Sequence, residues 1–555
     1  MRFMKISEAL ARALRAETET VFGLMGDGNV PLWGAMVGAG IRVYASRHEA
    51  AAVAMADGYA RVNGCVGVVT VTWGPGLTQT GTSLMVAARN HTPLVLLLPE
   101  LPAGNKNDLQ AMDQRRFVEA CGARYLQLSR PDSLAEDIVE AFYAATVQSG
   151  PIVLAFSIDL LEQELEWDFA YQPAAHYVAQ PAGADADSVE WLAHQLLASQ
   201  RPVIIGGRGA KASGAREEIT RVADGVGALL ATTLQAKGLF DGHPYDLGIA
   251  GAFASRPGEE LFAEADFVLG FGAELGYYTT EGGLLFPSAR VARVDLREPP
   301  RIGVLPGRFI RGDARKTALA INTELERRRA RSDGYRNSET RSVLARPAPP
   351  LESSGDGLDP RLLMRQLSAA LPRGSRLTCG AGHFFGFVGM YLALPEDGDI
   401  QFSSQFGAVG QTLPLALGMA LAHPAEPHIL IEGDGSLLFH LQELETAVRC
   451  GVSLALILLN DAGYGAEAHK LATQGFDPEL ARWRSPDFVA TAKALGGDGV
   501  LLRREADLPA ALARARERGG LYLIDCRISR AILTDPYQKI HHGRENQAPL
   551  LRRPR

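Results

Sequence analysis

The stretch "HILIEGDGSLLFHLQELETAVRCGVSLALILLND" (residues 428–461) carries the strongest structural signal of this sequence. A mostly apolar run leads to Asp434, an amphipathic helical pattern follows, and a second apolar run leads to Asp461. Strand and helix alternating at this spacing predict parallel strands. Because ligands bind beyond the carboxyl ends of such strands, we expect both aspartates at a ligand-binding edge of a sheet.

The same alternation runs through most of the 555 residues, which are too many for a single core. Apolar runs such as "VGVVTVT" (66–72), "RPVIIGG" (201–207) and "LYLIDC" (521–526) read as strands between helical patterns. The segments 167–186 and 331–357 lose the pattern and are predicted linkers. We predict an α/β fold of three doubly wound parallel-sheet domains, at residues 1–170, 186–335 and 357–530, with a tail at 531–555.

Composition narrows the class of protein. Hydrophobic residues make up 46% and charged residues 21%, as in an ordinary globular enzyme, and the net charge of −7 argues against nucleic acid as a partner. The five cysteines are scattered, so we expect no disulfide framework or zinc site and a reducing, cytoplasmic location. No run approaches 18 apolar residues, so we expect no membrane span, and "MRFMKISEALARAL" (1–14) reads as a helix and not as a signal peptide.

The two aspartates of the opening stretch suggest a metal site. The Gly435 and Ser436 amides lie at the N-terminus of the helix predicted at 436–451, and main-chain amides at a helix N-terminus suit an anion. Two carboxylates beside an anion site suit Mg²⁺ bridging a diphosphate. An isolated Gly-Asp-Gly would be no more than a tight turn, but Asp461, 27 positions after Asp434, favours the metal site.

The spacing of "GDG" (433–435) and Asn-Asp (460–461) resembles the thiamine diphosphate motif, and the three-segment layout resembles the acetolactate synthase and pyruvate decarboxylase family over nearly the whole chain. The resemblance implies thiamine diphosphate and Mg²⁺ as cofactors. It implies Asp434, Asp461 and the Gly463 carbonyl as metal ligands, with Asn460 as the alternative if the register differs by one. Many relatives have Asn at position 461. The acid here should tighten metal binding and slightly oppose the diphosphate.

The first segment should supply the acid that activates the cofactor. Glu49, in "SRHEAAAVAMADGYARVNG" (46–64), matches the family's glutamate, which hydrogen-bonds the aminopyrimidine ring. The simpler interpretation is a helix-starting Glu stabilised by the helix dipole, and beside the metal motif we favour the catalytic one. The resemblance places Val409 where a bulky residue props the bent cofactor, and Gly407 where a carbonyl accepts from the aminopyrimidine amine.

Further cofactor contacts follow from the same resemblance. The loop "CGAGHFFGF" (379–387) matches the segment that touches the diphosphate, although its histidine could equally lie in a surface turn. The implied cofactor-binding residues are Gly382, His383, Phe384, Gly433, Gly435, Ser436, Gln79 and Tyr464.

Substrate-side residues leave two reactions open. Asp27 and Glu467 match the two active-site acids of pyruvate decarboxylases, but the paired histidines of those enzymes are missing. Gln110, in "LQAMDQ" (109–114), instead matches acetolactate synthases. We expect decarboxylation of a 2-oxo acid and ligation of the remaining fragment to a carbonyl acceptor. The alternative is a decarboxylase that releases an aldehyde. A protein that binds the cofactor without catalysis is disfavoured, because it would not need Glu49.

The family also implies an assembly. In relatives the Glu49 segment of one chain faces the Asp434 segment of another, so we expect a homodimer or homotetramer with sites at the dimer interface. The central domain holds FAD in acetolactate synthases and nothing in many relatives. "GGRGA" (206–210) is a weak phosphate-loop signal, so we do not expect FAD.

Overall fold

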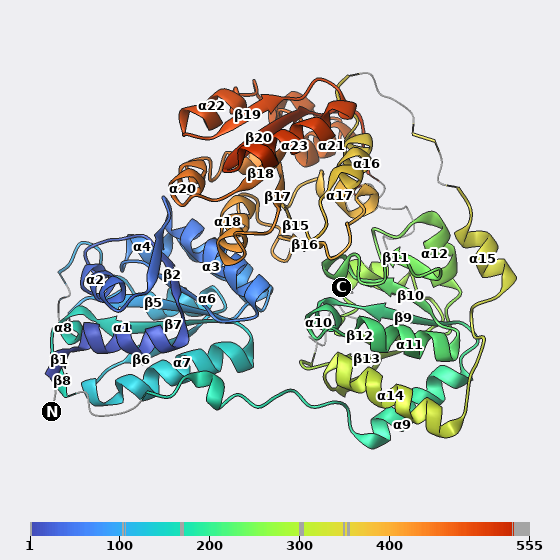
Figure 1. The fold of residues 1–555 in the computed structure, drawn as a ribbon, viewed down its shortest axis with the longest axis horizontal. Helices are drawn as coiled ribbons and strands as arrows, with labels where there is room; N and C mark the ends of the chain where they lie inside the picture. Colours follow the sequence, from blue (N-terminus) through green and yellow to red (C-terminus); the bar gives the residue numbers. More distant parts are fainter. Residues whose placement is uncertain are drawn as a thin grey trace.

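The chain forms three lobes that follow one another along the sequence (Figure 1). In this computed structural model the described residues are 3–102, 105, 107–166, 171–298, 305–347, 350–351, 356–534 and 537. Each lobe contains one six-stranded sheet in which every neighbouring pair is parallel. Helices pack on both faces of the first sheet. The predicted fold class, three doubly wound parallel-sheet domains, is confirmed.

The first sheet has the strand order β3-β2-β4-β5-β7-β6. One face packs against α1 (Ile6–Glu17), α2 (Val30–Gly38) and α7 (Leu134–Gln148), and the other against α3 (Glu49–Asn63) and α5 (Gly81–Arg89). The strands are β2 (Thr20–Gly23), β3 (Arg42–Ala45), β4 (Gly67–Thr70), β5 (Leu94–Glu100), β6 (Arg124–Leu128) and β7 (Pro151–Ser157). A separate antiparallel pair joins β1 (Phe3–Lys5) to β8 (Glu164–Glu166).

The central sheet has the order β11-β10-β9-β12-β13-β14. Its strands are β9 (Pro202–Gly206), β10 (Leu229–Thr232), β11 (Asp246–Ile249), β12 (Phe267–Phe271), β13 (Arg290–Asp295) and β14 (Arg308–Arg311). Its main helices are α9 (Ala186–Ala198), α11 (Arg216–Val226), α12 (Arg256–Ala263) and α14 (Ala314–Arg328).

The second predicted linker, 331–357, is partly structured. It contains α15 (Ser338–Leu344), whose Val343 belongs to the core of the central lobe. The buried Tyr335 donates its hydroxyl to the carbonyl of Leu261 at 2.9 Å. Because the segment is polar and Pro-rich in composition, the sequence did not indicate these few buried side chains. They pack the segment against the central lobe.

The third sheet has the order β16-β15-β17-β18-β20-β19. Its strands are β15 (Arg376–Cys379), β16 (Asp399–Phe402), β17 (His428–Gly433), β18 (Leu454–Asn460), β19 (Asp498–Leu501) and β20 (Leu521–Arg527). Its helices include α16 (Pro360–Ala370), α17 (Phe385–Tyr391), α18 (Thr412–Ala422), α21 (Gly465–Thr473), α22 (Phe488–Ala494) and α23 (Leu508–Arg518). Most of the tail predicted at 531–555 lies outside the described residues.

The single helix predicted after the Gly-Asp-Gly turn is wrong. The chain forms two short helices, α19 (Asp434–Leu437) and α20 (Glu443–Arg449), with tight turns between them. The His440 amide donates to the Leu437 carbonyl at 3.2 Å in that connection. The break lets the buried Glu443 carboxylate accept the amide of Arg47, in the first lobe, at 3.0 Å. A contact between the first and third lobes therefore prevails here over the sequence periodicity that predicts one continuous helix.

The first and third lobes meet where α3 packs antiparallel against α18 (Figure 1). A Cβ atom on Gly58 would lie 2.1 Å from the Leu415 carbonyl oxygen, and one on Gly418 would lie 1.9 Å from that of Met55. Only glycine permits such close backbones. One apolar core continues across this contact from the first sheet to the third. Among the described residues, no helix is both long and apolar enough to cross a membrane.

Candidate active site

Asp434 and Asp461 lie next to each other, as the sequence predicts. They follow β17 and β18, which are neighbours in the third sheet, and their carboxyl groups lie close enough to affect each other's pKa. Burial, and then repulsion from Asp461, raises the pKa of Asp434, and burial also raises the pKa of Asp461. Two neighbouring acids at adjacent strand ends would have their negative charges offset if a cation bound there.

The two aspartates fit a magnesium ion whose remaining ligands are other oxygen atoms. The Asp434 Oδ2 atom is buried and has no hydrogen-bond partner within the part of the chain that the structure describes. That same part contains no group of three or more His, Cys, Asp or Glu that could hold a metal. Mg²⁺ is commonly held by one or two carboxylates together with phosphate oxygens and water, so two aspartates suffice when a diphosphate is present.

Asn460 is fully engaged in shaping the turn after β18. Its amide nitrogen donates to Asp525 Oδ1 and Ser485 Oγ, both at 2.9 Å, and its Oδ1 accepts from the Ala462 amide at 3.1 Å. These bonds support Asp461 over Asn460 as the ligand. The role of the Gly463 carbonyl stays a prediction.

The loop after β15 borders the aspartate pair. His383 is buried, and its Nδ1 lies 3.8 Å from Asp461 Oδ2, so the surface-turn interpretation of this histidine is wrong. Burial, followed by repulsion from His469, lowers the pKa of His383 to about 4, which keeps the ring neutral at pH 7. The Phe384 ring lies against Gly382 and Gly433: a Cβ on these glycines would come within 2.7 and 2.8 Å of it.

The segment that should support the cofactor bend is anchored to the same strand end. Ser436 Oγ accepts the Gly410 amide at 2.8 Å, next to Val409. Gly407 has φ +70°, and a Cβ there would meet no atom within 4 Å, so this turn borders open space. The Tyr464 ring lies 2.8 Å from where a Gly435 Cβ would be.

Glu49 begins α3, with His48 as the helix cap. The His48 Nδ1 accepts the Ala50 amide at 3.1 Å, which fixes the start of the helix. A Cβ on Gly76 would lie 3.8 Å from Glu49 Oε1, so the carboxylate faces the loop "GPG" (74–76). Gln79, just beyond this loop, is exposed.

The predicted substrate-side residues divide between two sheet edges. Asp27 and Gln110 follow β2 and β5, and the neighbouring strands β3-β2-β4-β5 bring both to the edge that also bears Glu49. The Gly28 amide donates to Thr72 Oγ1 at 3.3 Å, which fixes the Asp27 loop. Both side chains are exposed. Glu467 is also exposed but lies on α21 of the third lobe.

One chain does not bring the two edges together. The pairs Gly58–Leu415 and Met55–Gly418 show that α3 and α18 run antiparallel. Glu49 therefore lies toward the end of α18, whereas Val409 precedes its start. At about 1.5 Å of rise per residue, the two are separated by roughly 20 Å along the helices.

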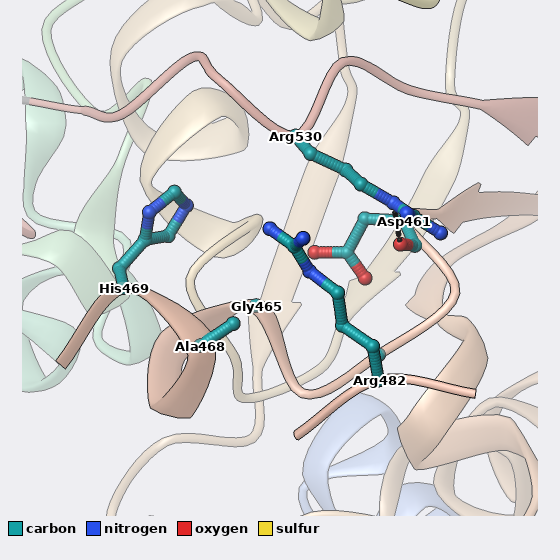
Figure 2. A pocket seen from close by; sticks show the side chains of 7 residues that line it. Asp461, Gly465, Ala468, His469, Arg482 and Arg530 are labelled. Atoms are coloured by element: carbon teal, nitrogen blue, oxygen red, sulfur yellow. Dashed lines mark hydrogen bonds between the residues drawn. The ribbon is translucent and has the colours of Figure 1, made fainter. Parts of the chain in front are cut away.

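Sequence reasoning missed two arginines around Asp461 (Figure 2). Arg530 Nε donates to the Asp461 carbonyl at 2.8 Å, and the Arg482 guanidinium lies beside the carboxylate. No motif marks either residue, because both reach the site through long-range backbone pairing. A positive charge three residues after the last strand was the one available signal.

The comparisons with known proteins agree with this architecture. Residues 4–117, 189–320 and 380–526 match the N-terminal TPP-binding, central and C-terminal TPP-binding domains of thiamine pyrophosphate enzymes. Thiamine pyrophosphate is another name for thiamine diphosphate.

Curated relatives align over most of their length. A protein named "Probable 2-ketoarginine decarboxylase AruI" from Pseudomonas aeruginosa is 29% identical over 506 residues, 88% of each chain. A sulfoacetaldehyde acetyltransferase from Castellaniella defragrans is 26% identical over 551 residues, covering 92% of this chain and 90% of that protein. An acetolactate synthase from Arthrospira platensis is 27% identical over 564 residues, covering 97% and 96%. With all three of its lobes matched in order, this chain belongs to the thiamine pyrophosphate enzyme family.

Proposed function

We propose that the enzyme decarboxylates a 2-oxo acid and ligates the remaining fragment to a second carbonyl compound, with thiamine diphosphate and Mg²⁺. The observation that carries the proposal is the position of Gln110, exposed beside Gly74 at the edge that bears Glu49. The only histidines within residues 1–170 are His48 and His91. His48 caps α3 and His91 precedes β5, so neither supplies the histidine pair of an aldehyde-releasing decarboxylase.

The residues of this chain would divide the work between binding and proton transfer. When bound, thiamine diphosphate would supply a nucleophilic carbon that adds to the carbonyl of the 2-oxo acid, and an electron sink that makes loss of CO₂ possible. Asp434 and Asp461 would hold the metal that binds the diphosphate, and Glu49 would exchange a proton with the aminopyrimidine ring. Val409, on the turn anchored by Ser436, would support the bend of the cofactor.

The separation of Glu49 from Val409 supports a homodimer or homotetramer. Large apolar side chains are exposed at both edges: Met25 and Val30 near Asp27, and Phe406 and Phe439 near Val409. A second copy would cover these side chains and bring the two edges together across an interface.

Two further expectations rest on local structure. The "GGRGA" turn (206–210) closes directly on β12, with the Gly209 amide donating to the Gly272 carbonyl at 3.0 Å, which supports a central domain that works without FAD. All five cysteines are free thiols, which supports the prediction of a reducing cytoplasm.

A simple decarboxylase is the second candidate. Asp27 and Glu467 could deliver a proton to the fragment left after CO₂ loss, and a relative carries the name of a 2-ketoarginine decarboxylase. A screen of 2-oxo acid donors with aldehyde and 2-oxo acid acceptors, following CO₂ and ligated product, separates the two. With pyruvate alone, acetolactate or acetoin supports ligation. Acetaldehyde as the sole product would overturn it.

A further inference from the structure

We infer that Arg482 and Arg530 are diphosphate-binding residues that offset the negative charge of Asp461. This inference rests on the proposed thiamine diphosphate site. Neither arginine belongs to the motif that identifies the metal site. Both line one pocket together with Asp461, Gly463 and His469 (Figure 2).

Arg530 is held in place by the backbone around the end of β20. The Ile528 amide donates to the Asn460 carbonyl at 3.0 Å, which continues the contact between β20 and β18. The Arg530 amide donates to Asp356 Oδ2 at 3.2 Å. Its Nε then reaches the Asp461 carbonyl at 2.8 Å. That acceptor is neutral, so this bond does not cancel the charge of the guanidinium.

Arg482 reaches the pocket from a different segment. The Tyr464 amide donates to the Ala481 carbonyl at 2.9 Å, and the Trp483 amide donates to the Ala462 carbonyl at 3.1 Å. These two bonds place Arg482 opposite Gly463, two residues after Asp461 in the chain. Its Nη1 also contacts Glu479 at 2.5 Å, but the Glu479 side chain is 64% exposed, so solvent weakens that pair.

Charge balance indicates what the arginines bind. The two negative charges of Asp434 and Asp461 together neutralise the two positive charges of one Mg²⁺ ion. No positive charge of the ion then remains to offset the negative charge of the diphosphate. An Asn at position 461 would leave one positive charge in excess. Two arginines that line the same pocket from separate segments supply the missing charge, and their forked N–H groups suit phosphate oxygens.

The test measures cofactor binding and not activity. Arg482→Gln and Arg530→Gln should each weaken binding of thiamine diphosphate about tenfold or more in calorimetry at saturating Mg²⁺, the scale of a hydrogen bond to a charged group. Inorganic pyrophosphate should show the same loss. Arg504→Gln is the matched control, since Arg504 pairs with Asp507 on the surface of the same lobe, and it should bind like the wild type.

Charge coupling provides a second arm. Adding Asp461→Asn to Arg530→Gln should make the effect of the arginine change smaller than in the parent protein, because the repulsion that it offsets is gone. Arg530→Lys keeps the positive charge and should retain more affinity for thiamine diphosphate than Arg530→Gln. The lysine variant also keeps the inference testable if the glutamine variant folds poorly.

The outcomes separate this inference from the proposed function. A wild-type protein that does not bind thiamine diphosphate contradicts the proposed function itself. Wild-type binding with unchanged affinity in both glutamine variants overturns only the role of the arginines. A raised KM for the 2-oxo acid with unchanged cofactor affinity would also overturn it, because the arginines would then bind substrate.

Discussion

At the scale of single residues, Glu49 provides the most direct test of cofactor activation. Glu49→Gln keeps the size of the side chain and can still hydrogen-bond a ring, but it cannot pass a proton back and forth. We expect the variant to bind thiamine diphosphate and to lose at least about 10²-fold in activity, the low end for a positioned proton-transfer group. Exchange of the cofactor C2 proton for deuterium, followed by NMR after acid quench, measures the step directly. Unchanged exchange would mean that another group activates the cofactor.

Asp434 tests the metal site in the same way. Its buried Oδ2 has no hydrogen-bond partner among the described residues, so Asp434→Ala removes a group whose expected partner is the ion. We expect loss of Mg²⁺-dependent cofactor binding, and release of cofactor from the wild type when the metal is chelated. Calorimetry and gel filtration with EDTA measure both. If the Asp434→Ala variant bound the cofactor with full affinity, the assignment of Asp434 as a metal ligand would be wrong.

At the scale of elements, the sequence predicts what short-range patterns encode. The apolar runs of β17 and β18 and the acids that follow them are local features, so the aspartate pair was predictable. The break between α19 and α20 was not, because the amide of Arg47 in another lobe helps to define it. Arg482 and Arg530 were missed for the same reason, since their positions depend on backbone bonds to distant segments.

The contact between α3 and α18 gives a prediction at this scale. Gly418→Ala would place a Cβ 1.9 Å from the Met55 carbonyl oxygen, so the helices must separate. We expect destabilisation by about 1–3 kcal/mol, the usual cost of overpacking, despite the better helix propensity of alanine. Gly34→Ala in α2 is the control, because a Cβ there meets no atom within 4 Å. Thermal unfolding should show a lower midpoint for Gly418→Ala and an equal or higher one for Gly34→Ala.

At the scale of the whole molecule, one chain keeps the edge that bears Glu49 apart from the edge that bears Val409. The antiparallel contact of α3 with α18 fixes the lobes so that Glu49 and Val409 lie roughly 20 Å apart along the helices, which no side-chain motion can bridge. We therefore expect activity to depend on assembly. On dilution, specific activity should fall along the same curve as the fraction of dimer or tetramer measured by light scattering. Excess thiamine diphosphate should shift both curves to lower protein concentration, because a ligand bound between subunits stabilises the assembly.

Mixing the Glu49→Gln and Asp434→Ala variants gives a sharper test of sites built from two subunits. In a mixed dimer, the site that pairs the Glu49 edge of one variant with the Asp434 edge of the other is either doubly mutated or fully wild type, so two inactive proteins should regain activity when subunits exchange. A fully active monomer at high dilution, or no recovery after proven exchange, would show that each site is built from a single chain.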